Sequence, residues 1–179
     1  TGSTVMTGLD GAPPGILLWR SVLQWLGGIG IIVMGVAVLP LLSVGGMQLF
    51  RTESSDRSDK IFARTGQLAS AIGLVYVVFT VACAAAYWAG GMDLFDAANH
   101  AMTTVATGGY STRDGSIGAF DSDFIEWAAV VFMLTGAIPF VLYIQALGGQ
   151  PEALARDTQL RWFAGIVLGA WALLTFDLV

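Results

Sequence analysis

The chain has 179 residues, of which 55% are hydrophobic and only 12% are charged, and its formal net charge is −5. This composition excludes an ordinary soluble domain, and the absence of a dense basic run excludes a nucleic-acid partner. Cys83 is the single cysteine, which excludes an intrachain disulfide.

No charged residue occurs in the stretches 21–50, 65–92, 127–151 and 162–176. A bilayer core of about 30 Å requires about 20 apolar residues in a helix. The sequence therefore predicts an all-α integral membrane protein in a lipid bilayer, with membrane helices at about 16–42, 66–89 and 124–147. The segment 162–179, which contains the fourth stretch, is predicted to be the start of a further membrane helix. Because the chain opens in polar sequence without Met, we expect an internal fragment of a longer protein.

The first predicted helix is rich in glycine, with Gly27, Gly28, Gly30 and Gly35 close together. Small residues let helix backbones approach closely in lipid, where packing drives helix association. This helix is therefore expected to pack tightly against a neighbour.

Basic residues concentrate in the loops on one side of the predicted membrane helices. The segment 47–65 holds Arg51, Arg57, Lys60 and Arg64, and the segment 148–161 holds Arg156 and Arg161. The opposite side has only Arg20 and Arg113, together with several aspartates. The positive-inside rule makes 47–65 and 148–161 cytoplasmic loops, and an acidic outer side would concentrate cations.

The segment 93–105, between the second and third membrane helices, is predicted to be a short helix that begins at an Asp93 N-cap. At about 16–18 Å it is too short to cross the bilayer, so we predict a re-entrant half-helix. Its C-terminus would place a negative partial charge near the bilayer centre, which favours a cation. Gly108 and Gly109 follow and would let successive carbonyls turn toward an ion. The alternative is an external amphipathic helix with a glycine C-cap.

The chain begins Thr1-Gly2, and the same pair recurs at Thr107-Gly108, each followed by a polar linker and a membrane helix. This recurrence predicts repeated helix, re-entrant pore loop and helix units, as in potassium channels. Residues 1–46 would end one unit, 66–147 would form a complete second unit, and 162–179 would begin a third. The predicted selectivity filter comprises Thr1, Gly2, Val105, Ala106, Thr107, Gly108 and Gly109, supported by Thr104 and Tyr110. His100, within the half-helix, is interpreted as a packing residue.

Several motifs resemble one family of potassium transporters, which includes the bacterial Trk and Ktr uptake subunits and the HKT transporters, with TrkH and TrkG most similar. They are Gln24-Trp-Leu-Gly-Gly-Ile-Gly-Ile-Ile-Val-Met34, Leu39-Pro-Leu-Leu42, Gly45-Gly-Met-Gln-Leu-Phe-Arg51, Phe95-Asp-Ala97, His100, Thr103-Thr-Val-Ala-Thr-Gly-Gly-Tyr-Ser-Thr112 and Ser116-Ile-Gly-Ala-Phe-Asp121. The resemblance implies four repeats around one pore, with filter glycines at Gly2 and Gly109. Gly108 is the weaker candidate for the second of these. It also implies K⁺ at the carbonyls of Val105, Ala106, Thr107 and Gly109.

The same resemblance implies the pore-forming subunit of a K⁺ uptake system in the bacterial inner membrane. It further implies a homodimer gated by a cytoplasmic TrkA-like regulatory subunit. NAD or adenine nucleotides are expected on that partner, and no cofactor is expected in this chain. A Na⁺-permeable relative and a non-conducting membrane scaffold are the alternatives. An enzyme is not expected, because the membrane helices hold no nucleophile, base or metal-ligand set.

Overall fold

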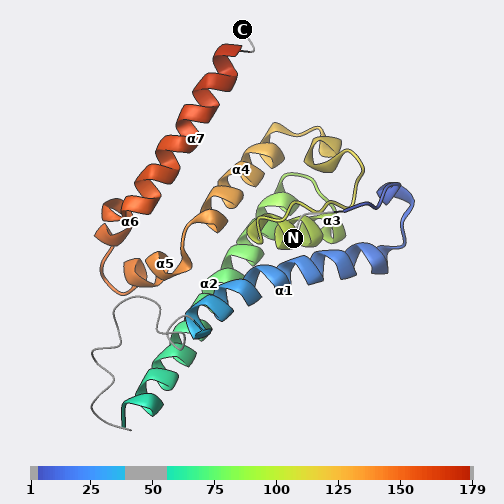
Figure 1. The fold of residues 1–179 in the computed structure, drawn as a ribbon. Coiled ribbons are helices and arrows are strands. Elements are labelled where there is room, and N and C mark those ends of the chain that lie inside the picture. Colours follow the sequence, from blue (N-terminus) through green and yellow to red (C-terminus); the bar gives the residue numbers. More distant parts are fainter. Residues whose placement is uncertain (1–3, 39–55, 178–179) are drawn as a thin grey trace. The chain divides into compact units, whose positions relative to one another are not determined.

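A computed structural model of the chain describes residues 4–38 and 56–177, which fall into two compact units divided between Ala137 and Ile138. All elements in this described part are helices, which confirms the predicted all-α fold (Figure 1). The first unit contains η1 (Leu9–Gly11), α1 (Pro14–Val38), α2 (Asp56–Ala89), α3 (Leu94–Val105), η3 (Ser116–Phe120) and α4 (Asp123–Ala137). The second unit contains α5 (Phe140–Leu147), α6 (Glu152–Arg156) and α7 (Thr158–Asp177).

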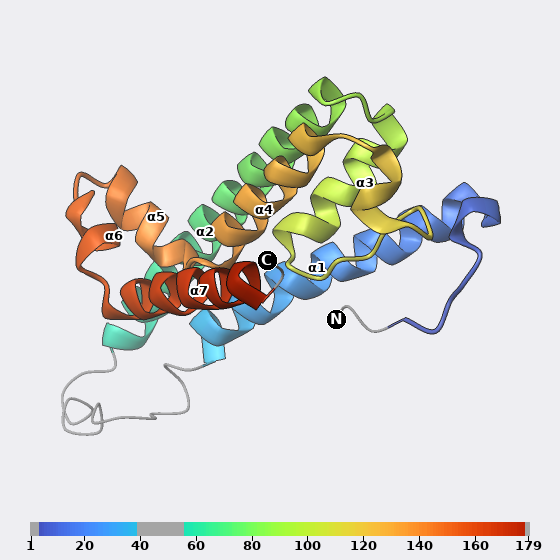
Figure 2. The same cartoon turned by 90° about the horizontal axis from the view of Figure 1, so that it is seen from above.

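The short helix α3 lies at the centre of the first unit, in contact with α1, α2 and α4 (Figures 1 and 2). Its buried residues include polar ones such as Asp96, Asn99 and His100. The outer faces of the surrounding helices instead expose large apolar side chains, for example Leu74, Val81 and Trp127. Exposed apolar side chains around a partly polar interior suit a protein whose outer surface contacts lipid.

Within the part of the chain that the structure describes, three helical segments are long and apolar enough to cross a membrane: Pro14–Ile32, Gly66–Ala89 and Thr158–Phe176. The pair α4 and α5 gives a fourth if it is counted as one broken span. The helix α2 begins at Asp56, ten residues before its apolar segment, within the predicted loop 47–65. Charged residues are compatible with a helix, so an apolar stretch marks the part suited to lipid rather than the end of the helix.

The segment 124–147, predicted to be one membrane span, is not a continuous helix, because α4 ends at Ala137 and α5 begins at Phe140. Pro139 lies at the break, with φ −55° and ψ 120°. Proline has no N–H to donate, and its ring disfavours the α conformation at the preceding residue, here Ile138. The Pro139 carbonyl accepts from the N–H of Leu142 at 2.9 Å and so starts the new helix. Pro139 therefore indicates the helix break in the sequence, whereas the hydropathy pattern does not show it.

In the second unit, α7 begins at Thr158 rather than at 162, because Asp157 caps it. The Asp157 Oδ1 accepts from the N–H of Leu160 at 2.8 Å. On α6, Arg156 and Glu152 form an ion pair at 2.7 Å with both side chains exposed, where such pairs add little stability.

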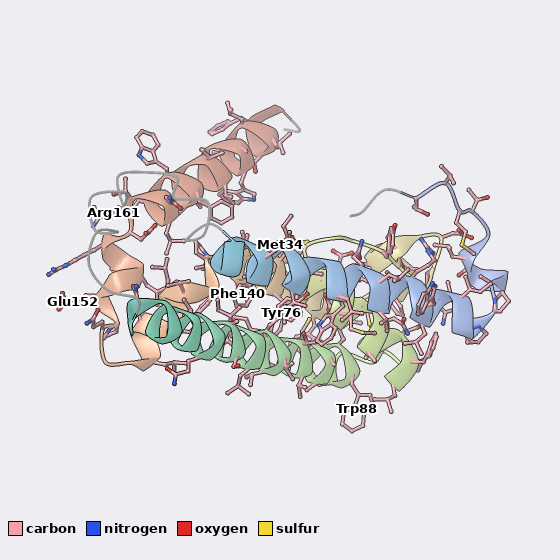
Figure 3. All side chains as sticks on the ribbon, turned by 60° about the horizontal axis from the view of Figure 1, so that its bottom comes forward. Met34, Tyr76, Trp88, Phe140, Glu152 and Arg161 are labelled. Atoms are coloured by element: carbon pink, nitrogen blue, oxygen red, sulfur yellow. The ribbon has the colours of Figure 1, made fainter. Side chains whose placement is uncertain are left out.

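The helices α1 and α2 are joined by an aromatic and hydroxyl cluster. The Tyr76 hydroxyl donates to the Trp25 carbonyl at 3.0 Å, and Trp25 Nε1 donates to Thr80 Oγ1 at 3.0 Å. Tyr76 lies between the two helices, whereas Trp88 projects outward from α2 (Figure 3). Gly28 allows this approach, because a Cβ there would lie 2.7 Å from the Tyr76 hydroxyl oxygen and 3.0 Å from Ala106 Cβ.

We expect Gly28→Ala to destabilise the protein although alanine is the better helix former. The change gains about 1 kcal/mol of helix propensity but overpacks the contact with Tyr76 and Ala106, at a cost of about 1–3 kcal/mol. Gly27→Ala is the matched control, because nothing lies within 4 Å of a Cβ at Gly27. Unfolding of the purified full-length protein in detergent measures both. Equal stability of the two variants would contradict tight packing at Gly28.

Candidate functional site

The site begins with α3 and its two ends. Its N-cap is Asp93, whose Oδ1 accepts from the Asp96 N–H at 2.8 Å, which confirms the predicted cap. At the other end the chain leaves the helix after Val105 and turns through Thr107 and Gly109, both in the left-handed region with φ 52° and 80°. The negative end of the α3 dipole therefore lies directly beside the glycine-containing segment.

The N–H groups of the segment 107–110 all find partners within the protein. Thr107 N–H donates to the Thr104 carbonyl at 2.9 Å, and Gly108 and Gly109 donate to the Thr103 carbonyl at 2.9 and 3.3 Å. Tyr110 N–H donates to Gln24 Oε1 on α1 at 3.1 Å. Four consecutive N–H groups are thus held by α3 and α1.

The geometry of the peptide bond then fixes the carbonyls of the same four peptides. In a planar trans peptide the C=O points opposite to the N–H, and there is no cis peptide in the described part of the chain. The carbonyls of Ala106, Thr107, Gly108 and Gly109 therefore point away from the groups that hold the N–H donors. Within residues 4–38 and 56–177, none of these four oxygens accepts a hydrogen bond. The Tyr110 carbonyl differs, because it accepts from Thr103 Oγ1 at 2.7 Å.

The structure brings the predicted residues 104–110 together in one turn, but it places Val105 differently from its neighbours. The Val105 side chain is buried, and its carbonyl oxygen lies against α4, 2.8 Å from where a Cβ of Gly136 would be. Thr1 and Gly2, the other predicted filter residues, lie outside the described residues. The role of all these residues in ion binding stays a prediction.

The two threonines at the end of α3 have different tasks. Thr104 Oγ1 bonds the Tyr87 hydroxyl of α2 at 2.8 Å, so it fixes α3 rather than the segment after it. Thr103 holds that segment directly, through its carbonyl and through its hydroxyl on Tyr110. Both threonines are buried, and Thr103 supports the turn although only Thr104 was predicted to do so.

We expect Thr103→Val to destabilise the protein by about 1–2 kcal/mol, because the buried hydroxyl that pairs with the Tyr110 carbonyl is lost. Thr103→Ser keeps the hydroxyl and serves as the control, with a smaller loss. Unfolding of the full-length protein in detergent compares the two variants. A valine variant as stable as the serine variant would show that the hydroxyl contributes nothing.

A second network ties the chain after Tyr110 back to α3. His100 Nδ1 lies 2.8 Å from the Asp96 carbonyl, which only accepts, so Nδ1 carries a proton. His100 Nε2 lies 2.8 Å from Ser111 Oγ, and that oxygen accepts from the Arg113 N–H at 3.0 Å. The Ser111 hydroxyl can therefore donate to a neutral His100. This arrangement bears out the interpretation of His100 as a hydrogen-bonded packing residue.

The strongest electrostatic contact of the site joins Asp96 and Arg113. Arg113 Nη2 and Nε lie 2.7 and 3.1 Å from Asp96 Oδ2, and Thr112 Oγ1 donates to Oδ1 at 2.7 Å. Burial by itself raises the pKa of Asp96, but the hydrogen bonds from Thr112 and Arg113 outweigh it and lower that pKa overall. The next residue, Asp114, accepts from the N–H groups of Leu9 and Gly8 at 3.0 and 3.1 Å, and these bonds lower its pKa.

Two residues of α1 reach the same segment from the other side. Gln24 is buried and contacts Gly108 as well as the Tyr110 N–H. Arg20, one turn earlier, places its guanidinium carbon 4.6 Å from the centre of the Tyr110 ring and donates to Thr4 Oγ1 at 3.1 Å. The helix α1 thus forms one wall of the site.

Comparison with known proteins decides the family. The family model of TrkH, described as a cation transport protein, matches residues 1–174. This chain belongs to the TrkH cation transport protein family. It is 52% identical over 162 residues to the Trk system potassium uptake protein TrkI of Halomonas elongata, covering 90% of this chain and 33% of TrkI. It is 45% identical over 169 residues to TrkH of Escherichia coli K12, covering 93% of this chain and 35% of TrkH.

A solved structure in the same family, the potassium transporter TrkH from Vibrio parahaemolyticus, matches with a TM-score of 0.77 and 40% identity. The match covers 92% of this chain and 33% of that one. The chain therefore spans about a third of the length of these TrkH relatives. Membership of a membrane transport family agrees with the expectation that the chain is no enzyme.

Several residues of this TrkH-family chain hold the turn without belonging to it and were not predicted in that role: Gln24, Thr103, Asp96 with Arg113, and Arg20. Gln24 begins one of the motifs that resemble the potassium-transporter family. A polar residue within a predicted membrane helix indicates a hydrogen-bonding role, so Gln24 could have been selected from the sequence. The partner of Gln24 could not be predicted from the sequence, because Gln24 and Tyr110 are 86 positions apart.

Proposed function

We propose that this chain forms part of the K⁺ pathway of a membrane uptake protein. The observation that carries the proposal is the set of four carbonyls, at Ala106, Thr107, Gly108 and Gly109, whose N–H partners are all held by the protein. Carbonyl oxygens turned away from the supporting protein can replace the hydration shell of a cation. The adjacent C-terminus of α3 adds a favourable negative partial charge.

The ion is inferred from the relatives, whose names describe potassium uptake proteins. In this proposal α3 is the half-helix of a re-entrant pore loop, and the α2, α3 and α4 segment is one of several repeats around the pore. Val105 stays a predicted ligand although its carbonyl oxygen lies against α4. Gly2 would contribute the equivalent turn of the preceding repeat. A Na⁺-permeable pore and a non-conducting scaffold are the competing functions.

Partners and location follow from the family resemblance and stay proposals. We infer a bacterial inner membrane location with 47–65 and 148–161 on the cytoplasmic side, a homodimer, and a TrkA-like regulatory subunit that carries NAD or adenine nucleotides. Cross-linking of the full-length protein in membranes measures the dimer. Nucleotide binding measured with and without the regulatory subunit tests where the nucleotide binds.

Flux measurements on the full-length protein test the function. We expect liposomes that contain it to take up a rubidium tracer down a K⁺ gradient, with K⁺ competing at least tenfold better than Na⁺. Equal competition by Na⁺ would favour the mixed cation pore, and the absence of flux with and without the regulatory subunit would favour the scaffold.

Labelling separates the re-entrant loop from an external helix. Cysteines introduced along 93–112 are expected to react with an impermeant thiol reagent at the outer end only. Reaction along the whole length would contradict a re-entrant helix. The native Cys83 is fully buried and gives a low background.

A further inference from the structure

The side chain of Gln24 lies where two helices and the glycine turn meet. It comes from α1, is 3% exposed, and directs Oε1 at the N–H of Tyr110 with a distance of 3.1 Å. The other three N–H groups of the turn bond to carbonyls at the end of α3, which belongs to the same repeat as the turn. The Gly109–Tyr110 peptide is therefore the one peptide of the four that is fixed by a side chain from outside its own repeat.

This contact sets the direction of one particular carbonyl. Because the peptide is planar and trans, the Gly109 carbonyl points away from Gln24 when the Tyr110 N–H points toward it. Gly109 has φ 80°, and glycine adopts both signs of φ readily, so the residue itself does little to prevent rotation of this peptide. The hydrogen bond from the Tyr110 N–H to Gln24 Oε1 therefore keeps the Gly109 carbonyl oxygen pointing away from Gln24.

We propose that Gln24 is a positioning residue for ion selectivity: it fixes the Gly109 carbonyl in the orientation that faces the ion. The inference deepens the proposed function and rests on it. In this arrangement the filter of one repeat depends on the last helix of the repeat before it. The geometry of the ion path is then shared between neighbouring repeats rather than built by each repeat alone.

The contact with Gly108 supports the same role. A Cβ at Gly108 would overlap Cδ, Nε2 and Cγ of Gln24, so the glutamine lies directly on the backbone of the turn. Glycine is thus needed at 108 for close approach and at 109 for backbone conformation. Each of the two glycines therefore has its own structural reason, whereas the family resemblance had only favoured Gly109 over Gly108.

Arg20 supports it from the ring side. Its guanidinium lies over the Tyr110 ring at 4.6 Å, four residues before Gln24 on the same helix. Gln24 thus holds the backbone of Tyr110, and Arg20 holds its side chain. A cation is attracted to the face of an aromatic ring, so the ring contact restrains Tyr110 in addition to the hydrogen bond.

The experiment compares two Gln24 variants in the full-length protein, with the K⁺ over Na⁺ permeability ratio in liposomes as the readout. Gln24→Leu keeps the bulk but removes the acceptor, and we expect the ratio to fall about tenfold. Gln24→Glu keeps an acceptor oxygen, and we expect the ratio to stay within about threefold of the wild type. Ser21→Ala is the matched control, because Ser21 is buried on the same helix and, among the described residues, its hydroxyl bonds the Leu17 carbonyl of that helix rather than the turn. We expect it to leave the ratio unchanged.

A double variant tests the contact without relying on the hydrogen bond. Gly108→Ala should reduce K⁺ flux strongly in the wild type but much less in a Gln24→Ala background, where the overlapping side chain is absent. Additive losses would overturn the contact, and an unchanged permeability ratio in Gln24→Leu would overturn the positioning role. Gly109→Ala keeps these failures separate from failure of the function. If Gly109→Ala changes selectivity and Gln24→Leu does not, only the inference on Gln24 is lost.

Discussion

Gly109→Ala is expected to reduce the K⁺ over Na⁺ permeability ratio of the full-length protein by tenfold or more. The reason is conformation rather than space: Gly109 has φ 80°, and nothing lies within 4 Å of a Cβ built there. An L-residue in the left-handed region costs roughly 1–2 kcal/mol, and the chain can relieve that strain by rotating the peptides on either side. Such rotation would turn the Gly108 or Gly109 carbonyl out of line. Uptake of a rubidium tracer against competing Na⁺ measures the change.

Gly91→Ala is the control that separates strain from selectivity. Gly91 also has a positive φ, 106°, with nothing within 4 Å of a built Cβ, but it lies at the end of α2 away from the glycine turn. We expect a comparable loss of stability and an unchanged permeability ratio. Gly109→Asn should be milder than Gly109→Val, because asparagine tolerates the left-handed region and a β-branched residue does not. If Gly91→Ala altered selectivity as much as Gly109→Ala, strain at the turn could not be the cause.

Arg113→Met is expected to destabilise the full-length protein by about 2 kcal/mol at neutral pH. The Asp96 side chain is 4% exposed, and the substitution leaves Thr112 as the remaining side-chain donor to its carboxylate. Loss of one partner of a fully buried pair costs about 3–5 kcal/mol, and the cost is smaller here because the Arg113 side chain is 41% exposed. Unfolding in detergent measures it. Asp10→Asn is the control: its pair with Arg113 is 4.0 Å long and exposed, so we expect a change below about 0.5 kcal/mol.

The effect of Arg113→Met should depend on pH in a defined direction. The pKa of Asp96 is lowered in the folded protein by the bonds from Thr112 and Arg113. Its contribution to stability is therefore complete above the unfolded-state pKa of about 3.9 and is lost as the pH falls through the lower folded-state pKa. The gap between wild type and Arg113→Met should be constant from about pH 7 to pH 5 and shrink below about pH 4. A gap that widened in acid would contradict the assignment.

Much of the fold could be predicted from the chain because it depends on local pattern. Uncharged stretches located the helices, Asp93 marked the start of α3, and the length of α3 indicated that it does not cross a bilayer. The break before Phe140 was equally local, since Pro139 stands in the sequence, but hydropathy does not register it. The extension of α2 back to Asp56 was not predicted for the same reason, because hydropathy marks the apolar segment and not the helix.

The glycine turn shows where local pattern ends. The sequence by itself determined that Thr107, Gly108 and Gly109 follow a short helix, and that glycine could turn the backbone there. Only the tertiary structure decided which groups hold the turn. Gln24 is 86 positions from Tyr110, and the choice of Thr103 over Thr104 depends on which way each side chain faces. Hydrogen bonds require atoms within about 3 Å in the right direction, and no spacing along a chain encodes such proximity between separate helices.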